Sequence, residues 1–150
     1  MTRREALIYA GVGLSVWLNG AITFRLGGRM LFTHGPAVTA LVALVIAALV
    51  CLTLRATMAW RKADPSKAME IAVVMALPGL FGEAVRQTVF GWATGLPANA
   101  GPSFAAVIFF GNATLMTYAF IRAQQSMSPP RGPRSLADQA KAAKPARADP

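Results

Sequence analysis

The sequence predicts an all-α integral membrane protein, a four-helix bundle followed by a disordered basic C-terminal tail. Three observations support this fold class. Of the 150 residues, 55% are hydrophobic and only 14% are charged, which is unusual for a soluble domain. Two windows, residues 36–54 and 101–121, contain no charged side chain, and each is close to the about 20 apolar residues that cross a hydrocarbon core. Two further apolar stretches with few charges bring the expected number of membrane-spanning helices to four.

The expected helices cover approximately residues 7–27, 36–54, 69–90 and 103–121. The first follows the basic segment MTRRE, and its length and the further spans favour an uncleaved helix over a signal peptide. The second opens with Pro36, at a position where a missing N–H costs nothing. A polar segment with a turn signal at Asp64 and Pro65 separates the second helix from the third. Residues 1–122 therefore form one membrane domain, and residues 123–150, which are rich in proline, alanine and basic side chains, form the disordered tail.

Lysine and arginine side chains are concentrated on one side of the expected spans, as is typical of a cytoplasmic face. With a cytoplasmic N-terminus, twelve of the fifteen basic residues lie on the cytoplasmic side. They are Arg3, Arg4, Arg55, Arg61, Lys62, Lys67, Arg122, Arg131, Arg134, Lys141, Lys144 and Arg147. This distribution predicts a multi-pass protein of the bacterial inner membrane with both termini in the cytoplasm. Contact with anionic lipid headgroups explains the formal charge of +9, and no nucleic acid partner is expected because no binding motif for one is present.

Four charged side chains depart from this pattern and form a candidate intramembrane polar cluster. Arg25 and Arg29 come near the end of the first span, and Glu83 and Arg86 lie in the outer half of the third. An unpaired charge inside a membrane costs about 2.5–3.5 kcal/mol, so Glu83 should face the bundle and find a partner. Arg86 lies three residues later on the same helix face, and Arg25 is the expected partner across the helix interface. In the alternative, Arg25 and Arg29 extend to the outer headgroups.

Two asparagines add to the polar cluster. Asn19 lies near the middle of the first span and Asn112 near the middle of the fourth, where interhelical hydrogen bonds are worth about 0.6–2 kcal/mol. The remaining candidates for chemistry are few. The single cysteine, Cys51, permits no internal disulfide and is expected to be a small buried hydrophobe, and His34 has no acidic residue or cysteine close in sequence. We therefore expect no catalytic, cofactor-binding or metal-binding residues, and no enzyme.

Two stretches, VWLNGAITFRLGGRMLF (residues 16–32) and ALPGLFGEAV (residues 76–85), resemble small bacterial four-span membrane proteins catalogued only as a domain of unknown function. The positions that match the family's pattern are Arg25, Gly28, Phe32, Pro78, Gly79 and Glu83. The sequence departs from that pattern in having Glu83 where the family has aspartate, and Arg86 in a region that is apolar in the family. The resemblance covers roughly residues 7–121. It implies a four-helix inner-membrane protein and supplies no activity.

Two hypotheses for function remain open at this point. In the first, the protein is a structural or accessory component of the membrane, acting as a homo-oligomer or with a membrane partner, and the polar cluster fixes the first helix against the third. In the second, the protein is a small transporter or channel-like protein that uses the cluster of Arg25, Glu83 and Arg86 as its polar site. They differ in whether Glu83 only joins helices or also takes part in a functional cycle.

Overall fold

A computed structural model of the protein describes residues 1–90, 94–97 and 99–127. The elements are α1 (Arg3–Thr33), α2 (Pro36–Arg61), the short 3₁₀ helix η1 (Pro65–Lys67), α3 (Ala68–Thr88) and α4 (Gly101–Met127). The described residues contain no strand, and four helices are long and apolar enough to cross a membrane. The predicted all-α four-helix fold is confirmed. The third helix agrees with its predicted range of 69–90 to within two residues at each end.

Other helices extend beyond their predicted spans. α1 begins at Arg3 because Thr2 caps it: Thr2 Oγ1 accepts a hydrogen bond from the Glu5 backbone N–H at 3.3 Å, and the Glu5 carboxylate accepts one from the Thr2 N–H at 2.8 Å. This capping box is polar and lies outside the apolar window. α2 continues to Arg61 and stops at Lys62, whose φ of 50° is left-handed. Hydropathy indicates the segment in lipid, whereas a helix ends where its backbone is capped.

The predicted boundary between the membrane domain and the tail is also displaced. α4 continues to Met127, and Ala123 within it is buried, so residues 123–127 belong to the helix. The apolar window ended before Arg122, but the alanine, glutamine and methionine side chains that follow are good helix formers. The rest of the predicted tail, residues 128–150, lies outside the described residues.

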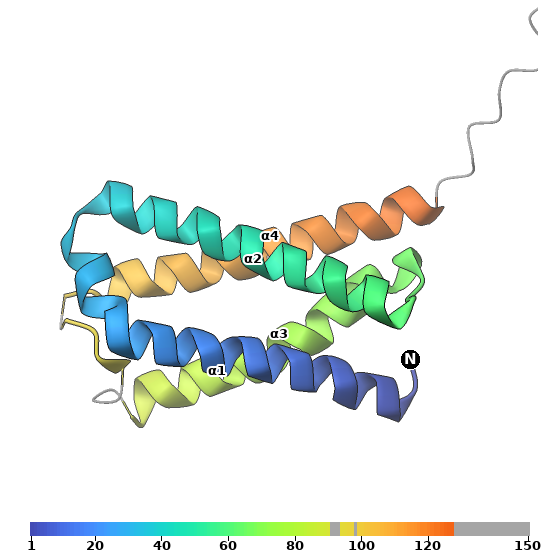
Figure 1. Ribbon diagram of the computed structural model, residues 1–150, viewed down its shortest axis with the longest axis horizontal. Helices are drawn as coiled ribbons and strands as arrows, with labels where there is room; N and C mark the ends of the chain where they lie inside the picture. Colours follow the sequence, from blue (N-terminus) through green and yellow to red (C-terminus); the bar gives the residue numbers. More distant parts are fainter. Residues whose placement is uncertain (91–93, 98, 128–150) are drawn as a thin grey trace, which may run out of the picture.

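The four helices pack in two pairs. Figure 1 shows that consecutive helices run in opposite directions, so the start of α1 and the end of α4 lie at one end of the bundle, which we call the terminal end. The opposite end, with the α1–α2 turn and residues 94–97, is the far end. α1 packs mainly against α3 and α2 against α4, whereas α1 and α2 make few contacts with each other. We call the space between these two helices the α1–α2 seam.

The buried apolar side chains of the described residues form two core clusters, one toward each end of the bundle. The first includes Tyr9, Leu54, Ile71 and Leu115, one from each helix. The second includes Phe24 and Phe104, whose rings meet edge to face with centroids 5.0 Å apart. Between them, α1 and α3 come into backbone contact, because a Cβ on Gly13 would lie only 1.8 Å from the Met75 carbonyl oxygen. Glycine is the one residue that permits this approach.

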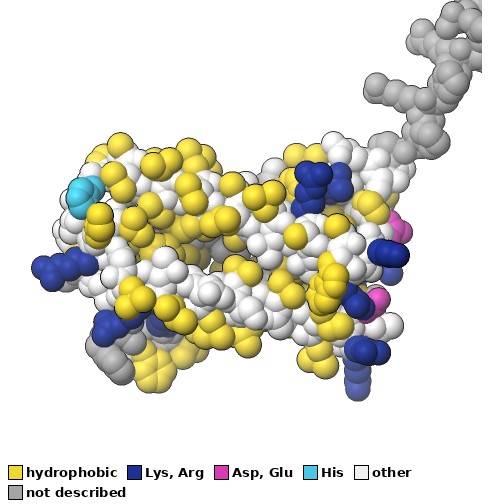
Figure 2. Space-filling view, in the orientation of Figure 1, with side chains coloured by type: hydrophobic (Ala, Val, Ile, Leu, Met, Phe, Trp, Pro, Cys, Tyr) yellow, Lys and Arg dark blue, Asp and Glu magenta, His cyan; other side chains and the backbone are white. Residues whose placement is uncertain are grey.

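The outer surface of the bundle is largely apolar. Many large hydrophobic side chains are exposed, among them Leu26 at 83%, Leu7 at 74% and Phe109 at 70%. Figure 2 shows hydrophobic side chains along the length of the bundle and lysine and arginine side chains toward its two ends. A soluble protein rarely exposes apolar surface on this scale, whereas lipid-facing helices require it. Together with the lengths of the helices, this surface identifies a multi-pass membrane protein.

Candidate functional site

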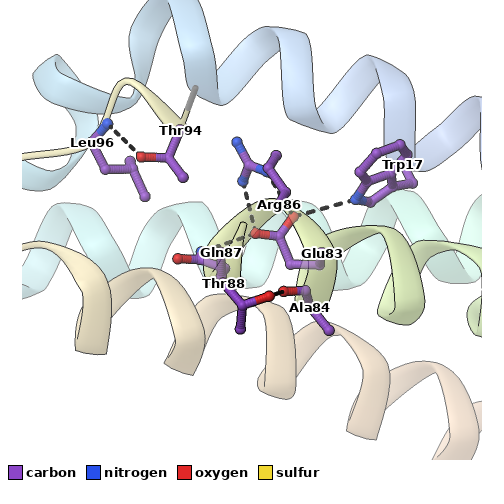
Figure 3. Close-up of polar contacts among 8 residues, drawn as sticks. All are labelled: Trp17, Glu83, Ala84, Arg86, Gln87, Thr88, Thr94 and Leu96. Carbon is purple, nitrogen blue, oxygen red and sulfur yellow. Dashed lines mark hydrogen bonds and ion pairs between the residues drawn. The ribbon is translucent and has the colours of Figure 1, made fainter. Parts of the chain in front are cut away.

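Glu83, in the part of α3 toward the far end, is the centre of a polar cluster that joins α3 to α1 (Figure 3). Arg86 donates to its carboxylate through Nη2 to Oε1 at 2.8 Å and through Nε to Oε2 at 3.2 Å. Gln87 Nε2 donates to Oε1 at 2.9 Å, and Trp17 Nε1 donates to Oε2 at 3.3 Å. Each carboxylate oxygen therefore accepts two hydrogen bonds, and the Arg86 guanidinium supplies the compensating charge.

Helical spacing accounts for two of the three partners. Arg86 and Gln87 lie three and four residues after Glu83, the distances at which side chains on one helix face meet. α3 continues through Pro78 without interruption, so the face is intact at this point. The predicted ion pair between Glu83 and Arg86 is confirmed.

The third partner, Trp17 on α1, reaches Glu83 because α3 is narrow where the indole lies. A Cβ on Gly82 would be 2.8 Å from the Trp17 ring, and a Cβ on Gly79 would be 3.4 Å from the Trp17 Cβ. These two glycines, one helical turn apart, leave a slot in α3 that a flat ring occupies. With the ring in the slot, its N–H points along α3 to the carboxylate (Figure 3).

Arg86 extends the cluster to a third helix. The side chain is almost fully buried, with the residue 8% exposed, and its guanidinium carbon lies 5.3 Å from the centroid of the Phe104 ring on α4. This is the geometry of a cation–π contact. Its Nη1 is buried and has no hydrogen-bond partner within the described part of the chain. The charge of Arg86 is thus matched by Glu83 alone among the ion pairs of the described residues.

The predicted role of Arg25 as the cross-helix partner of Glu83 was wrong. The ion pairs between described residues do not join the two side chains. Arg25 is exposed, and its side chain lies against the loop before α4, where a Cβ on Gly95 would be 3.2 Å from Arg25 Nη1. It stands two helical turns beyond Trp17, or about 12 Å along α1. Arg29 is also exposed near the far end of α1, outside the cluster.

Among the described residues, Asn19 and Asn112 do not form the interhelical hydrogen bonds predicted for them. Asn19 Nδ2 donates to the Ser15 carbonyl oxygen and Asn112 Nδ2 to the Ile108 carbonyl oxygen, both at 2.9 Å and both within the same helix. The two asparagines nevertheless share a location with Glu83, because all three line one cavity of about 880 Å³ to which all four helices contribute residues.

Among the six predicted site residues, the structure thus brings Glu83 and Arg86 into contact and places Asn19 and Asn112 on the wall of the same cavity. Trp17 was missed in the sequence. A signal for it existed in the glycines that precede Glu83, since two small residues one turn apart favour the approach of a neighbouring helix. That signal indicates a close contact but not which side chain makes it.

The cluster is suited to holding helices together. Both oxygens of the carboxylate are occupied, and the Glu83 side chain in the ion pair is 12% exposed.

In the portion of the chain that the structure describes, no three His, Cys, Asp or Glu side chains lie where they could hold a metal ion. The single histidine, His34, contacts the Met30 carbonyl oxygen, and the single cysteine, Cys51, is a partly buried residue of α2.

A comparison with protein families relates most of the chain to a known family. A family of unknown function, DUF5367, matches residues 30–126, which include Glu83, Arg86 and Asn112 but not Trp17 or Asn19. Neither a curated protein nor a solved structure matches the chain. The family match is in agreement with the resemblance seen in the third span, and it covers well over half of the 150 residues. The protein is therefore a member of the DUF5367 family, whose function is unknown.

Proposed function

We propose that this protein is a structural or accessory component of the bacterial inner membrane, without catalytic activity, that acts as a homo-oligomer or with a larger membrane partner. The observation that carries the proposal is the saturation of the Glu83 carboxylate by four hydrogen bonds from Arg86, Gln87 and Trp17. A carboxylate in this state fixes α1 against α3. The exposed apolar surface, which includes Leu26 and Phe109, is available to lipid and to other membrane helices.

Transport through the cluster has less support. A carboxylate that carries protons or cations must exchange its partner during each cycle. Glu83 is instead held by donors on two helices, and Arg86, three residues away, already matches its charge. Release of Glu83 would leave a buried guanidinium without a counter-ion, which is unfavourable in a membrane.

The placement in the inner membrane with cytoplasmic termini rests on the basic residues. Arg3, Arg4, Arg61, Lys62 and Lys67 all belong to segments at the terminal end of the bundle. An excess of basic residues is typical of the cytoplasmic side. There they would contact anionic lipid headgroups. This contact accounts for the excess positive charge without a nucleic acid partner.

The test compares Glu83→Gln with the double variant Glu83→Gln/Arg86→Leu in a bacterial strain that lacks the protein. The double variant removes the uncompensated charge. It keeps one side-chain oxygen as an acceptor for either Trp17 or Gln87, which donate to different oxygens of the Glu83 carboxylate. Membrane abundance is measured by quantitative immunoblotting and fitness by growth in competition with the wild type. A structural role predicts that the single variant lowers both quantities together and that the double variant restores both.

Two outcomes would contradict the proposal. If the double variant recovers its abundance but not its fitness, the charged groups themselves are needed, and transport is favoured. If the single variant changes neither quantity, Glu83 does not hold the helices together.

A further inference from the structure

The cavity between the four helices has a shape that suits a long guest. It has a volume of about 880 Å³, within the range of about 300–1,000 Å³ found for ligand pockets. Its wall follows α1 from Ile8 to Phe24, a rise of about 24 Å at 1.5 Å per residue. The cavity is therefore long and lies parallel to the helices.

Access to the cavity is from the side. Toward the terminal end, the first core cluster joins all four helices, and toward the far end Phe24 and Phe104 pack together. Packed side chains thus join the helices at both of these levels. The α1–α2 seam has few contacts, and Figure 2 shows a hollow between these two helices on the face turned to the viewer. In a membrane this face lies against lipid, so a guest would enter from the bilayer.

The polar side chains on the cavity wall offer mainly acceptors. Ser15, Asn19, Thr53 and Asn112 line the cavity, and each donates to the backbone carbonyl oxygen four residues earlier in its own helix at 2.8–2.9 Å. The single hydroxyl protons of the serine and the threonine are used in this way, as is one N–H of each asparagine. Thr23 also lines the cavity and adds one oxygen and one hydroxyl proton. The five side-chain oxygens still outnumber the donors that remain, which are one N–H of each asparagine and the Thr23 proton. A guest that donates hydrogen bonds therefore fits this wall.

The charge of the wall selects against a charged guest. Glu83 is the single carboxylate among the residues that line the cavity, and its charge is matched by Arg86. The wall is accordingly neutral, and most of the side chains in it are apolar. Moving an ion into such a site has a high desolvation cost, whereas an alcohol can donate its one proton and place its hydrocarbon against the remainder of the wall.

We propose that this cavity binds a neutral amphiphile with a long apolar chain and a hydroxyl group. The chain lies along α1, and the hydroxyl donates to the side-chain oxygen of Asn19 or Asn112. This site goes beyond the proposed structural role and does not depend on it, because the binding groups are the asparagines and the test leaves Glu83 and Arg86 unchanged.

Binding is measured by quenching of Trp17, which lines the cavity, in protein reconstituted in phosphatidylcholine nanodiscs. The other two tryptophans are replaced (Trp60→Phe and Trp92→Phe); Trp60 also lines the cavity, and phenylalanine keeps an aromatic ring there. The probes are 2-bromododecan-1-ol and its methyl ether, in which a methyl group replaces the hydroxyl proton. The alcohol should reach half-quenching at a mole fraction about 3- to 30-fold lower than the ether, as expected for one hydrogen bond in lipid. Replacing both asparagines (Asn19→Leu/Asn112→Leu) should bring this ratio close to one.

A matched pair of glycine variants on α1 tests the location. A Cβ at Gly20 or at Gly27 meets no atom within 4 Å, but only Gly20 lines the cavity. Gly20→Leu should obstruct the cavity beside Asn19 and weaken saturable quenching, with a melting temperature equal to or above that of the parent. Gly27→Leu should bind as the parent does.

Three results would overturn the proposal. The first is equal half-quenching by the alcohol and the ether in the parent protein, which is the behaviour of simple partition into the bilayer. The second is undiminished quenching in Gly20→Leu. The third is a parent dimer that Gly20→Leu converts to a monomer, since the cavity is then filled by a helix of a second copy.

Discussion

Replacing Glu83 by glutamine is the sharpest test of how α1 and α3 are held together. The substitution keeps the shape of the side chain but removes its charge, and it turns one of the two oxygens into an NH₂ group. The new NH₂ group would lie opposite a hydrogen-bond donor that in the wild type donates to a carboxylate oxygen. Arg86, already with a buried Nη1 that lacks a partner among the described residues, would lose its counter-ion as well.

The size of the effect follows from the burial of the pair. The side chains of Arg86 and Glu83 are 9% and 12% exposed, and breaking such a pair by removing one partner costs about 3–5 kcal/mol. This corresponds to a drop of roughly two to four orders of magnitude in the folding equilibrium constant. The same helix contains a matched control: Glu70 pairs with the N-terminal ammonium at 3.5 Å, but its side chain is 48% exposed. Glu70→Gln should cost about 0–1 kcal/mol.

The assay is the free energy of unfolding from SDS titration in mixed micelles, measured for both single variants and for Glu83→Gln/Arg86→Leu. The double variant should recover most of the loss, because replacing a buried ion pair by groups that leave no charge unpaired is often close to neutral. A cost for Glu83→Gln as small as that for Glu70→Gln would refute the reasoning. So would a double variant as unstable as the single one.

Three further predictions concern packing, topology and acid stability. Gly13→Ala and Gly82→Ala should each lower the free energy of unfolding by about 1–3 kcal/mol. The new methyl group would overlap a backbone oxygen in the first variant and an indole ring in the second. Gly20→Ala, which has open space around the new Cβ, should lower the free energy of unfolding by less or raise it. A reporter fused after Pro150 should indicate the cytoplasm, and a periplasmic signal would overturn the proposed orientation. Asp64 accepts a hydrogen bond from the backbone N–H two residues later in η1, which lowers its pKa below the ordinary value. The stability from this cap is present above the unfolded pKa of about 3.9 and is lost as the pH falls through the lower pKa of the folded state. Asp64→Ala should therefore flatten the acid side of a plot of melting temperature against pH.

The helices could be predicted from sequence because the thickness of a bilayer sets a length for apolar runs. The charge-free windows coincide with the greater parts of α2 and α4. The ends of the helices depend on local capping instead. Thr2 extends α1 through a capping box, and Lys62 closes α2 in a left-handed conformation. Such signals are short and polar, so they fall outside any window chosen for hydrophobicity.

The local half of the polar cluster was predictable and the half that crosses between helices was not. Glu83 and Arg86 lie on one helix, where a spacing of three residues guarantees proximity. The partner on α1 depends on how that helix is rotated and shifted against α3, and complementary charge favoured Arg25. Helix packing instead makes Trp17 the partner, because the slot at Gly79 and Gly82 admits its ring. An indole N–H then serves as the donor, and no second cation is required.

The structural role and the proposed binding role both depend on α1 but use different side chains of it. Trp17 lies over the glycines of α3 and donates to Glu83. Asn19 follows two residues later, about 200° around the helix, and its amide is engaged with its own backbone at 2.9 Å rather than with α3. A leucine at position 19 removes an oxygen from the cavity wall and leaves the Glu83 contacts in place, whereas a glutamine at position 83 disturbs the α1–α3 contact and leaves Asn19 on the wall. The two proposals can therefore fail independently, and each variant serves as a control for the other.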